Sequence, residues 1–180
     1  MKKVITKSVV LFTLMAAFAI IFVGCSKDSS SSNSGGGPTP PQPGTYGTFT
    51  YGETSCSIAY GGYDCYYDED DEEYVFTIGF ADSESENSNA FAIAFIDRQT
   101  IPTGTFSYTT ENPSSNAPEG YLITSDQHVY YCNSGSVTIT KNGTSYTVTS
   151  QATVCDFFGQ NTVNFTLSYT GPLPEFEDEE

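Results

Sequence analysis

Cysteines are the first residues in this sequence that could do covalent chemistry. Four of them follow residue 45, namely Cys56, Cys65, Cys132 and Cys155. A zinc site needs ligands at short spacing, such as C-x2-C, and these cysteines offer none. In an oxidising compartment disulfides are favoured instead, and four cysteines allow three pairings. We prefer Cys56–Cys65, which a four-residue loop would place opposite each other, and Cys132–Cys155, which flank a predicted hairpin.

The carboxylates and the single histidine, His128, give weaker signals. The acidic run from Asp68 to Glu73 suggests Ca²⁺, but calcium loops alternate acids with spacers and a glycine, so a solvated loop is favoured. His128 lies beside Asp126, yet no G-x-S-x-G motif accompanies it and a satisfied strand histidine is the better interpretation. No two carboxylates are marked as a glycosidase pair. The sequence therefore predicts no enzyme, no metal site and no cofactor.

Tyrosines are the remaining residues that could contact a ligand, and the chain has 13 of them. Tyr66-Tyr67 and Tyr130-Tyr131 each follow or precede a cysteine. Adjacent side chains on a strand point to opposite faces, so one tyrosine of each pair is expected to face outward. Outward tyrosines could stack on sugar rings or anchor a protein interface. Packing in the core or across strands is the alternative interpretation.

The N-terminus has the layout of a secretory signal. Three lysines precede an uncharged apolar run of 17 residues, Ser8 to Gly24, which is also close to the length of a membrane-spanning anchor. The end of the run, Phe22-Val23-Gly24-Cys25, resembles the lipobox of bacterial lipoproteins. The resemblance implies that residues 1–24 are a signal peptide and that Cys25 carries two or three acyl chains, which is a stable anchor.

Residues 25–44 and 174–180 are expected to lie outside any folded domain. Ser26 to Gly44 is rich in Ser, Gly and Pro without apolar periodicity, which predicts a disordered tether, and the C-terminus is an acidic tail. Lys27-Asp28 is similar to the short export signals of Bacteroidota lipoproteins, which implies the outer membrane, at the cell surface or on its periplasmic side. Without residues 1–24 the net charge is 3 − 22 = −19, which argues against nucleic-acid binding.

Residues 45–173 are long enough for one domain with its own core, and their pattern is that of an all-β protein. Asn142-Gly143 between alternating runs predicts a two-residue type I′ hairpin, with Ile139 opposite Tyr146 and Val137 opposite Val148. Further strands are expected over Thr162–Tyr169, Tyr74–Phe80 and Ala90–Ile96, the last central or covered on both sides. Shorter strands are expected near Thr48–Tyr51, Thr54–Ile58, Thr105–Tyr108 and His128–Cys132. About 8–10 short strands indicate an antiparallel β-sandwich or a closed β-barrel.

Three short motifs carry a resemblance to a protein family. IPTGTFSY, GSVTITKNGTSYTVTS and VNFTLSYTGPL look like the closing half of small β-rich surface lipoproteins of Bacteroidota. The resemblance implies a fold and an envelope location, and it transfers no catalytic or binding residue. We therefore expect a lipid-anchored, non-enzymatic binding module whose ligand is a glycan or a surface protein. The alternative is a structural component of a surface layer or adhesive assembly, which would make its contacts through edge strands.

Overall fold

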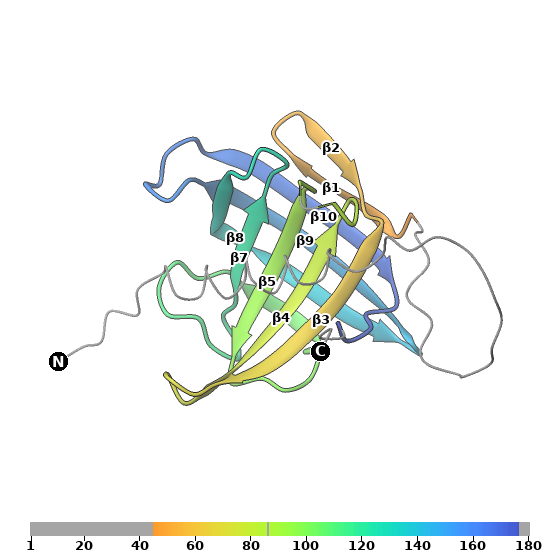
Figure 1. Ribbon diagram of the computed structural model, residues 1–180, viewed down its shortest axis with the longest axis vertical. Coiled ribbons are helices and arrows are strands. Elements are labelled where there is room, and N and C mark those ends of the chain that lie inside the picture. Colours follow the sequence, from red (N-terminus) through yellow and green to blue (C-terminus); the bar gives the residue numbers. More distant parts are fainter. Residues whose placement is uncertain (1–44, 86, 177–180) are drawn as a thin grey trace.

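The computed structural model describes residues 45–85 and 87–176. As predicted, these residues form an all-β structure, with ten strands and no helix in the described ranges (Figure 1). The predicted strand Ala90–Ile96 is confirmed at both ends. The strands are β1 (Gly47–Tyr51), β2 (Thr54–Ser57), β3 (Tyr60–Asp68), β4 (Glu73–Ala81), β5 (Ala90–Ile96), β6 (Gly104–Ser107), β7 (Glu119–Ile123), β8 (Val129–Asn142), β9 (Ser145–Cys155) and β10 (Val163–Gly171).

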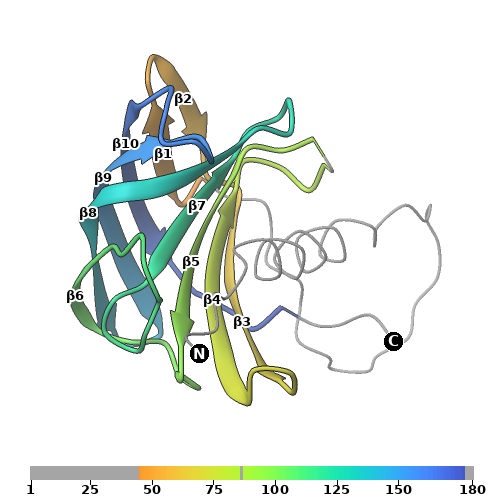
Figure 2. The same cartoon turned by 90° about the vertical axis from the view of Figure 1, so that its left-hand side faces the viewer.

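All ten strands belong to one antiparallel sheet, in the order β2-β1-β10-β9-β8-β7-β5-β4-β3, with β6 paired to β8. The sheet curls strongly into a half-barrel (Figure 2). As a result β2 and β3, which stand at opposite ends of the strand order, are separated along the chain only by Ile58 and Ala59. The sequence left a sandwich and a barrel open, and the structure is one curled sheet.

The C-terminal segment extends the sheet beyond β10. A parallel bridge joins Glu175 to Tyr63 on β3. The backbone N–H of Tyr63 donates to the Pro174 carbonyl at 2.9 Å, and that of Phe176 donates to the Tyr63 carbonyl at 2.8 Å. Residues 174–176, which the sequence assigns to the acidic tail, therefore lie along an edge strand and protect part of it.

The β8–β9 hairpin is confirmed, but its predicted register is wrong. Ile139 pairs with Val148 and Val137 pairs with Ser150, because Asn142 is the last strand residue and pairs with Ser145. The loop consists of Gly143 and Thr144, and only Gly143 has a positive φ, of 62°. A glycine with positive φ at the first loop position is the requirement of a type II′ turn, whereas type I′ requires positive φ at both positions.

Two strands, β3 and β7, are absent from the sequence prediction. β3 contains Gly61-Gly62, which the sequence indicates as a loop, but both glycines lie in the sheet opposite β4. A Cβ on Gly61 would lie 2.7 Å from the Tyr169 ring, and one on Gly62 would lie 2.5 Å from the Phe176 ring. The glycines therefore make room for two aromatic rings rather than form a turn. β7 is short and follows a segment rich in Asn, Ser and Pro.

The main core fills the inside of the curl. Phenylalanines and aliphatic residues from almost every strand meet there, with Phe49, Phe91 and Phe165 essentially inaccessible to solvent. Phe91 and Phe165 stack with ring centroids 4.1 Å apart. A second, smaller cluster of buried residues lies on the outside of the sheet, around Ala92 and Tyr121. The sheet thus has apolar surface on both faces of β4, β5 and β7.

The predicted signal peptide (1–24), the lipidated Cys25, the tether (25–44) and the last acidic residues (177–180) lie outside the described residues. Within residues 45–176, Glu86 excepted, the structure contains no helix of the length and hydrophobicity needed to cross a membrane.

Candidate functional site

One half of the outer sheet surface carries mainly small polar side chains. Along β10, β9 and β8 the residues alternate between the core and the outside, as the hairpin pattern predicts. We call the outer surface of β2, β1, β10, β9, β8 and β6 the hydroxyl face. Its side chains are Ser55, Ser57, Thr48, Thr50, Asn164, Thr166, Ser168, Thr170, Thr147, Thr149, Gln151, Thr153, Ser134, Ser136, Thr138, Thr140, Thr105 and Ser107.

The strand register sets these side chains in rows across the sheet. One row runs through Ser57, Thr48, Ser168, Thr149, Thr138 and Thr105, one residue from each of six strands. Hydroxyl groups bond within three cross-strand pairs: Thr50–Thr166 at 2.7 Å, Thr105–Thr138 at 2.9 Å and Thr147–Thr170 at 3.2 Å. Directly opposite side chains on antiparallel strands are about 4.5–5.5 Å apart, so the hydroxyl groups form a regular array.

The hydroxyl face contains an open depression of about 450 Å³. It is lined by Thr48, Ser136, Thr138, Thr149, Ser150, Gln151, Thr166, Leu167 and Ser168. No lining residue is charged. A depression of this kind offers hydroxyl groups that both donate and accept hydrogen bonds, together with one amide, Gln151.

Charge is distributed unevenly around the domain. The chain has 22 acidic and 6 basic residues, yet the hydroxyl face has neither. The carboxylates concentrate instead at the β3–β4 turn, where Asp68 to Glu73 follow one another. Burial, and then the nearby Asp71, Asp97 and Asp68, raise the pKa of Glu73. The end of the half-barrel that carries the β3–β4 turn is therefore strongly negative, whereas the hydroxyl face is neutral.

The acidic run forms a turn without a metal cluster. Asp68 Oδ1 accepts hydrogen bonds from the backbone N–H groups of Asp70 at 3.0 Å and Asp71 at 3.4 Å, so the first carboxylate organises the turn itself. Among the described residues, no three His, Cys, Asp or Glu side chains converge as a metal site would require.

The four tyrosines singled out from the sequence lie apart. Tyr67 is 49% exposed and packs edge to face on Tyr74, with centroids 5.1 Å apart. Tyr66 lies half-buried on the outer surface of β3, Tyr130 packs on the main core, and Tyr131 packs on Tyr121. Since β4, β5 and β7 separate β3 from β8 in the sheet, Tyr66 and Tyr67 do not share a site with Tyr130 and Tyr131.

All four described cysteines are free, so neither predicted disulfide is formed. Cys56 pairs with Phe49 across β1 and β2, and Cys65 pairs with Phe76 across β3 and β4, so no hairpin joins them. Burial and then Asp82 raise the pKa of the Cys56 thiol to about 11. A protonated, buried thiol is a poor nucleophile.

A β-bulge separates the second cysteine pair. Without it, the register of the hairpin would place Cys132 directly opposite Cys155. The register shifts between Cys132 and Ser134, so Cys132 pairs with Val154 and Cys155 pairs with Tyr131. A one-residue shift turns a side chain to the other face, which leaves Cys132 in the core and Cys155 outside it.

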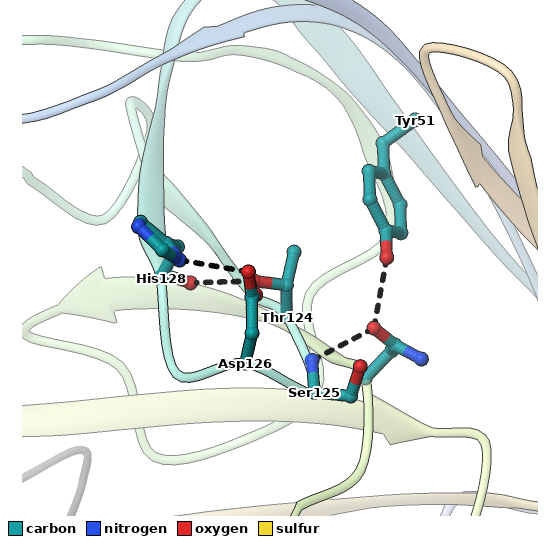
Figure 3. A network of polar contacts seen from close by, with 6 residues as sticks. Tyr51, Thr124, Ser125, Asp126 and His128 are labelled. Carbon is teal, nitrogen blue, oxygen red and sulfur yellow. Dashed lines mark hydrogen bonds and ion pairs between the residues drawn. The ribbon is translucent and has the colours of Figure 1, made fainter.

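A polar network occupies the opposite end of the barrel, where β1, β4, β7 and β8 meet their loops (Figure 3). Tyr51 Oη and the backbone N–H of Ser125 both donate to Asn89 Oδ1, each at 2.9 Å. Asp82 accepts from Asn89 Nδ2 at 2.7 Å. This network ties the β4–β5 and β7–β8 loops to the end of β1.

His128 belongs to the same end of the barrel but lies on its surface. Its Nδ1 is 3.0 Å from Asp126 Oδ2, and both side chains are about two-thirds exposed, at 68% and 70%. Thr124 Oγ1 donates to Asp126 Oδ1 at 2.5 Å, which lowers the pKa of that carboxyl, with a smaller contribution from His128. The pair therefore stands on an exposed turn, and the hydroxyl group bonded to the Asp126 carboxylate is that of Thr124.

Sequence reasoning missed an exposed aromatic pair in the β9–β10 loop. Phe157 and Phe158 are 62% and 81% exposed, and their rings pack edge to face. Asp156 Oδ1 accepts from the backbone N–H groups of Phe158 and Gln160, which fixes the loop. The sequence Asp-Phe-Phe-Gly-Gln-Asn could have indicated this exposed pair, because two large apolar residues are unusual inside a polar turn.

The chain matches no protein-family model, no curated protein and no solved structure.

Proposed function

We propose that this chain is a lipid-anchored envelope protein whose domain is a non-enzymatic binding module, and that its ligand is a neutral glycan held on the hydroxyl face. The single observation that supports this ligand is the absence of charged side chains from the outward positions of six strands of a strongly acidic protein. The anchor is supported by the sequence around Cys25. The sequence at Lys27-Asp28 supports the outer membrane as its location.

The chemistry of the hydroxyl face suits a polyhydroxylated ligand. Each Ser or Thr hydroxyl can donate one hydrogen bond and accept two, as sugar hydroxyls do. The rows of hydroxyls repeat at the spacing of the strands, and the depression between Thr48, Thr149 and Ser168 provides a starting point for a chain laid across them. Uronic or sulfated glycans would be repelled by the net charge of the domain. The hydroxyl face has no aromatic platform, so we expect weak affinity per site.

A glycan array with the soluble form, residues 26–180, tests the proposal. We expect retention of neutral polysaccharides and no retention of anionic ones. The variant Thr149→Glu places a carboxylate in the depression, at an exposed strand position. This variant should abolish retention of the glycan. Gln160→Glu, in the exposed β9–β10 loop, is the matched control and should bind normally.

A second variant separates the two candidate contact surfaces. The exposed Tyr67–Tyr74 pair could also stack on sugars or anchor a protein. If Tyr67→Ala abolishes glycan retention while Thr149→Glu does not, the tyrosine pair is the contact surface and the hydroxyl face is not. If no glycan is retained at all, the proposed ligand class is wrong.

Assembly through edge strands is the alternative function, and the structure gives it less support. β2 is only four residues long, and residues 174–176 pair with the middle of β3. Short or covered edges resist the addition of further strands. We therefore expect the soluble form to remain monomeric at high concentration in light-scattering measurements.

A further inference from the structure

The β9–β10 loop, residues 156–162, presents two phenylalanine rings to solvent. Phe157 is 62% exposed and Phe158 is 81% exposed, which are the highest values among the large apolar side chains of the described ranges. Neither ring belongs to a buried cluster. In Figure 1 this loop is the blue segment that projects from the sheet at the upper left. Two adjacent exposed rings mark a contact surface, because water solvates such side chains poorly.

The loop is held in one conformation by its own hydrogen bonds. Asp156 Oδ1 accepts from the backbone N–H groups of Phe158 at 3.0 Å and Gln160 at 2.7 Å, and Asp156 Oδ2 accepts from Asn161 Nδ2 at 2.8 Å. The backbone N–H of Gly159 donates to the Asp156 carbonyl at 2.9 Å. The rings therefore stand on an ordered support, and a ligand that contacts them loses little affinity to ordering of the loop.

Tyr131, near the start of β8, supports the Phe157 ring. The two rings pack edge to face with centroids 6.2 Å apart. Tyr131 lies opposite Cys155 on the outer side of the sheet, because the register shifts between Cys132 and Ser134. A continuous register would pair Cys132 with Cys155 and turn Tyr131 inward, away from the loop. The β-bulge thus aims Tyr131 at Phe157, and bulges that aim a side chain in this way are typical of the surroundings of functional sites.

The two rings continue the outer surface that carries the hydroxyl face. Gln151 on β9 lines the depression, and the next outward residue along the strand is Thr153, opposite Ser134. Cys155 follows, beside the rings. From Gln151 to Cys155 is four residues, or about 13 Å along the strand. No side chain on this path is charged. A sugar chain of a few units therefore reaches from the depression to the rings.

The rings and the adjoining hydroxyl groups need different parts of one ligand. Phenylalanine has no polar tip, so its ring attracts a ligand only through its π-system and its apolar area. The C–H face of a sugar ring packs flat on such a ring, while the sugar hydroxyl groups point sideways to donors and acceptors such as Thr153 and Ser134. A lipid or an apolar peptide would cover the rings but would leave these hydroxyl groups facing apolar atoms. An anionic sugar chain would be repelled by the acidic domain.

We infer that Phe157 and Phe158 form a stacking platform for one sugar unit at the end of the hydroxyl face, and that the ligand is a neutral chain of pyranoses with equatorial hydroxyl groups. An axial hydroxyl group interrupts the C–H face and weakens stacking, which sets this preference. The following units lie over Thr153 and Gln151 and lead to the depression. The inference rests on the proposed glycan-binding function, and it supplies the aromatic contact that the hydroxyl face itself lacks.

Cellohexaose, a neutral chain of pyranoses with equatorial hydroxyl groups, is the probe. It is titrated into the soluble form, residues 26–180, and binding is followed by calorimetry and by the proton NMR spectrum of the sugar. We expect upfield ring-current shifts of sugar C–H protons. The double variant Phe157→Leu/Phe158→Leu keeps apolar side chains but removes both rings, so it should abolish these shifts and weaken the affinity at least about fivefold. Phe157→Tyr/Phe158→Tyr keeps both rings and should retain the shifts and the affinity.

Tyr67→Leu is the matched control, because it removes an exposed ring of the Tyr67–Tyr74 pair and leaves the platform intact. It should bind cellohexaose as the parent does. All these variants should keep the melting temperature of the parent, because the substituted side chains are exposed. Mannohexaose, whose units carry an axial hydroxyl group, should bind the parent more weakly than cellohexaose does.

The outcomes separate the platform from the proposed function. If the double leucine variant binds cellohexaose as tightly as the parent while Thr149→Glu does not bind it, the hydroxyl face binds the glycan alone and the platform is refuted. Loss of binding in the tyrosine variant or in Tyr67→Leu, or equal affinity for mannohexaose, would also overturn the inference. Retention of other neutral glycans without cellohexaose overturns the inference alone. If the parent retains no neutral glycan, the proposed function is wrong and the inference is wrong with it.

Discussion

The hydrogen bond between Tyr108 and Ser150 gives the sharpest test of how the interior is built. The two hydroxyl groups lie 2.9 Å apart inside the half-barrel, and their residues are 8% and 3% exposed. Ser150 also lines the depression of the hydroxyl face. Tyr108→Phe removes one hydroxyl and leaves that of Ser150 buried without this partner. Ser150→Ala does the converse.

Removing one partner of a buried hydrogen bond costs more stability than removing both, and this difference sets the expected changes in unfolding free energy. Each single variant should destabilise the domain by about 1–3 kcal/mol, because a buried polar group loses its partner. For a domain of this size that corresponds to a fall of roughly 4–12 °C in melting temperature. The double variant Tyr108→Phe/Ser150→Ala removes both groups and should cost about 1 kcal/mol or less.

Urea unfolding at pH 7, followed by circular dichroism, measures the four corners of this double-mutant cycle. We expect a coupling free energy of at least about 1 kcal/mol, since the double variant should cost less than the two single effects added together. If the two single effects simply add in the double variant, the hydroxyl groups do not stabilise one another, and the proposed interior contact is refuted. A loss of the unfolding slope in either single variant would show instead that the native state has loosened.

Three further predictions concern the ionisable groups. Burial raises the pKa of Cys56 to about 11 and the pKa of Tyr60 to about 12. The stability that these protonated groups contribute is therefore present at neutral pH and should be lost as the pH rises from about 9 to 12. Thermal melts at a series of pH values would detect this loss. A reducing agent should leave the melting temperature unchanged, because Cys132 and Cys155 are free, and a fall of several degrees would show a disulfide. Glu73→Gln should raise the melting temperature at pH 7 slightly, because the raised pKa of that carboxyl disfavours its charged form, and the gain should vanish below pH 4.

Local patterns in the sequence were enough to predict the fold class and most strands. The alternation of Val163, Phe165 and Leu167 with polar residues predicts β10, and the all-apolar run Ala90–Ile96 predicts a strand buried on both faces, as the structure has it. These features depend on the side chains of one strand and on which face each side chain occupies, and they can be predicted without knowledge of the partner strand.

The features that the sequence did not predict depend on distant partners. Gly61-Gly62 is a typical turn signal, and only the positions of Tyr169 and Phe176 explain why it belongs to β3. The bulge between Cys132 and Ser134 has no local signature, yet it turns Cys155 away from Cys132 and removes the predicted disulfide. The tyrosines illustrate the same limit, since the topology of the sheet decides that Tyr66 and Tyr131 lie on separate strands with three others between them.

The two halves of the outer sheet surface differ in the residues that their strands place outward, which are hydroxyl-bearing in one half and apolar in the other. β9 and β10 place hydroxyl groups outward, so this half of the sheet is stable in water and free to meet a polar ligand. β4 and β5 instead place the buried Val75, Ala92 and Ala94 on the outer side, so the outer side of that half is apolar. The polar half is the one that suits the proposed glycan, whereas the apolar half offers no outward hydroxyl array. Because β7 pairs with β8 within one continuous sheet, the two halves are held in a fixed relative orientation.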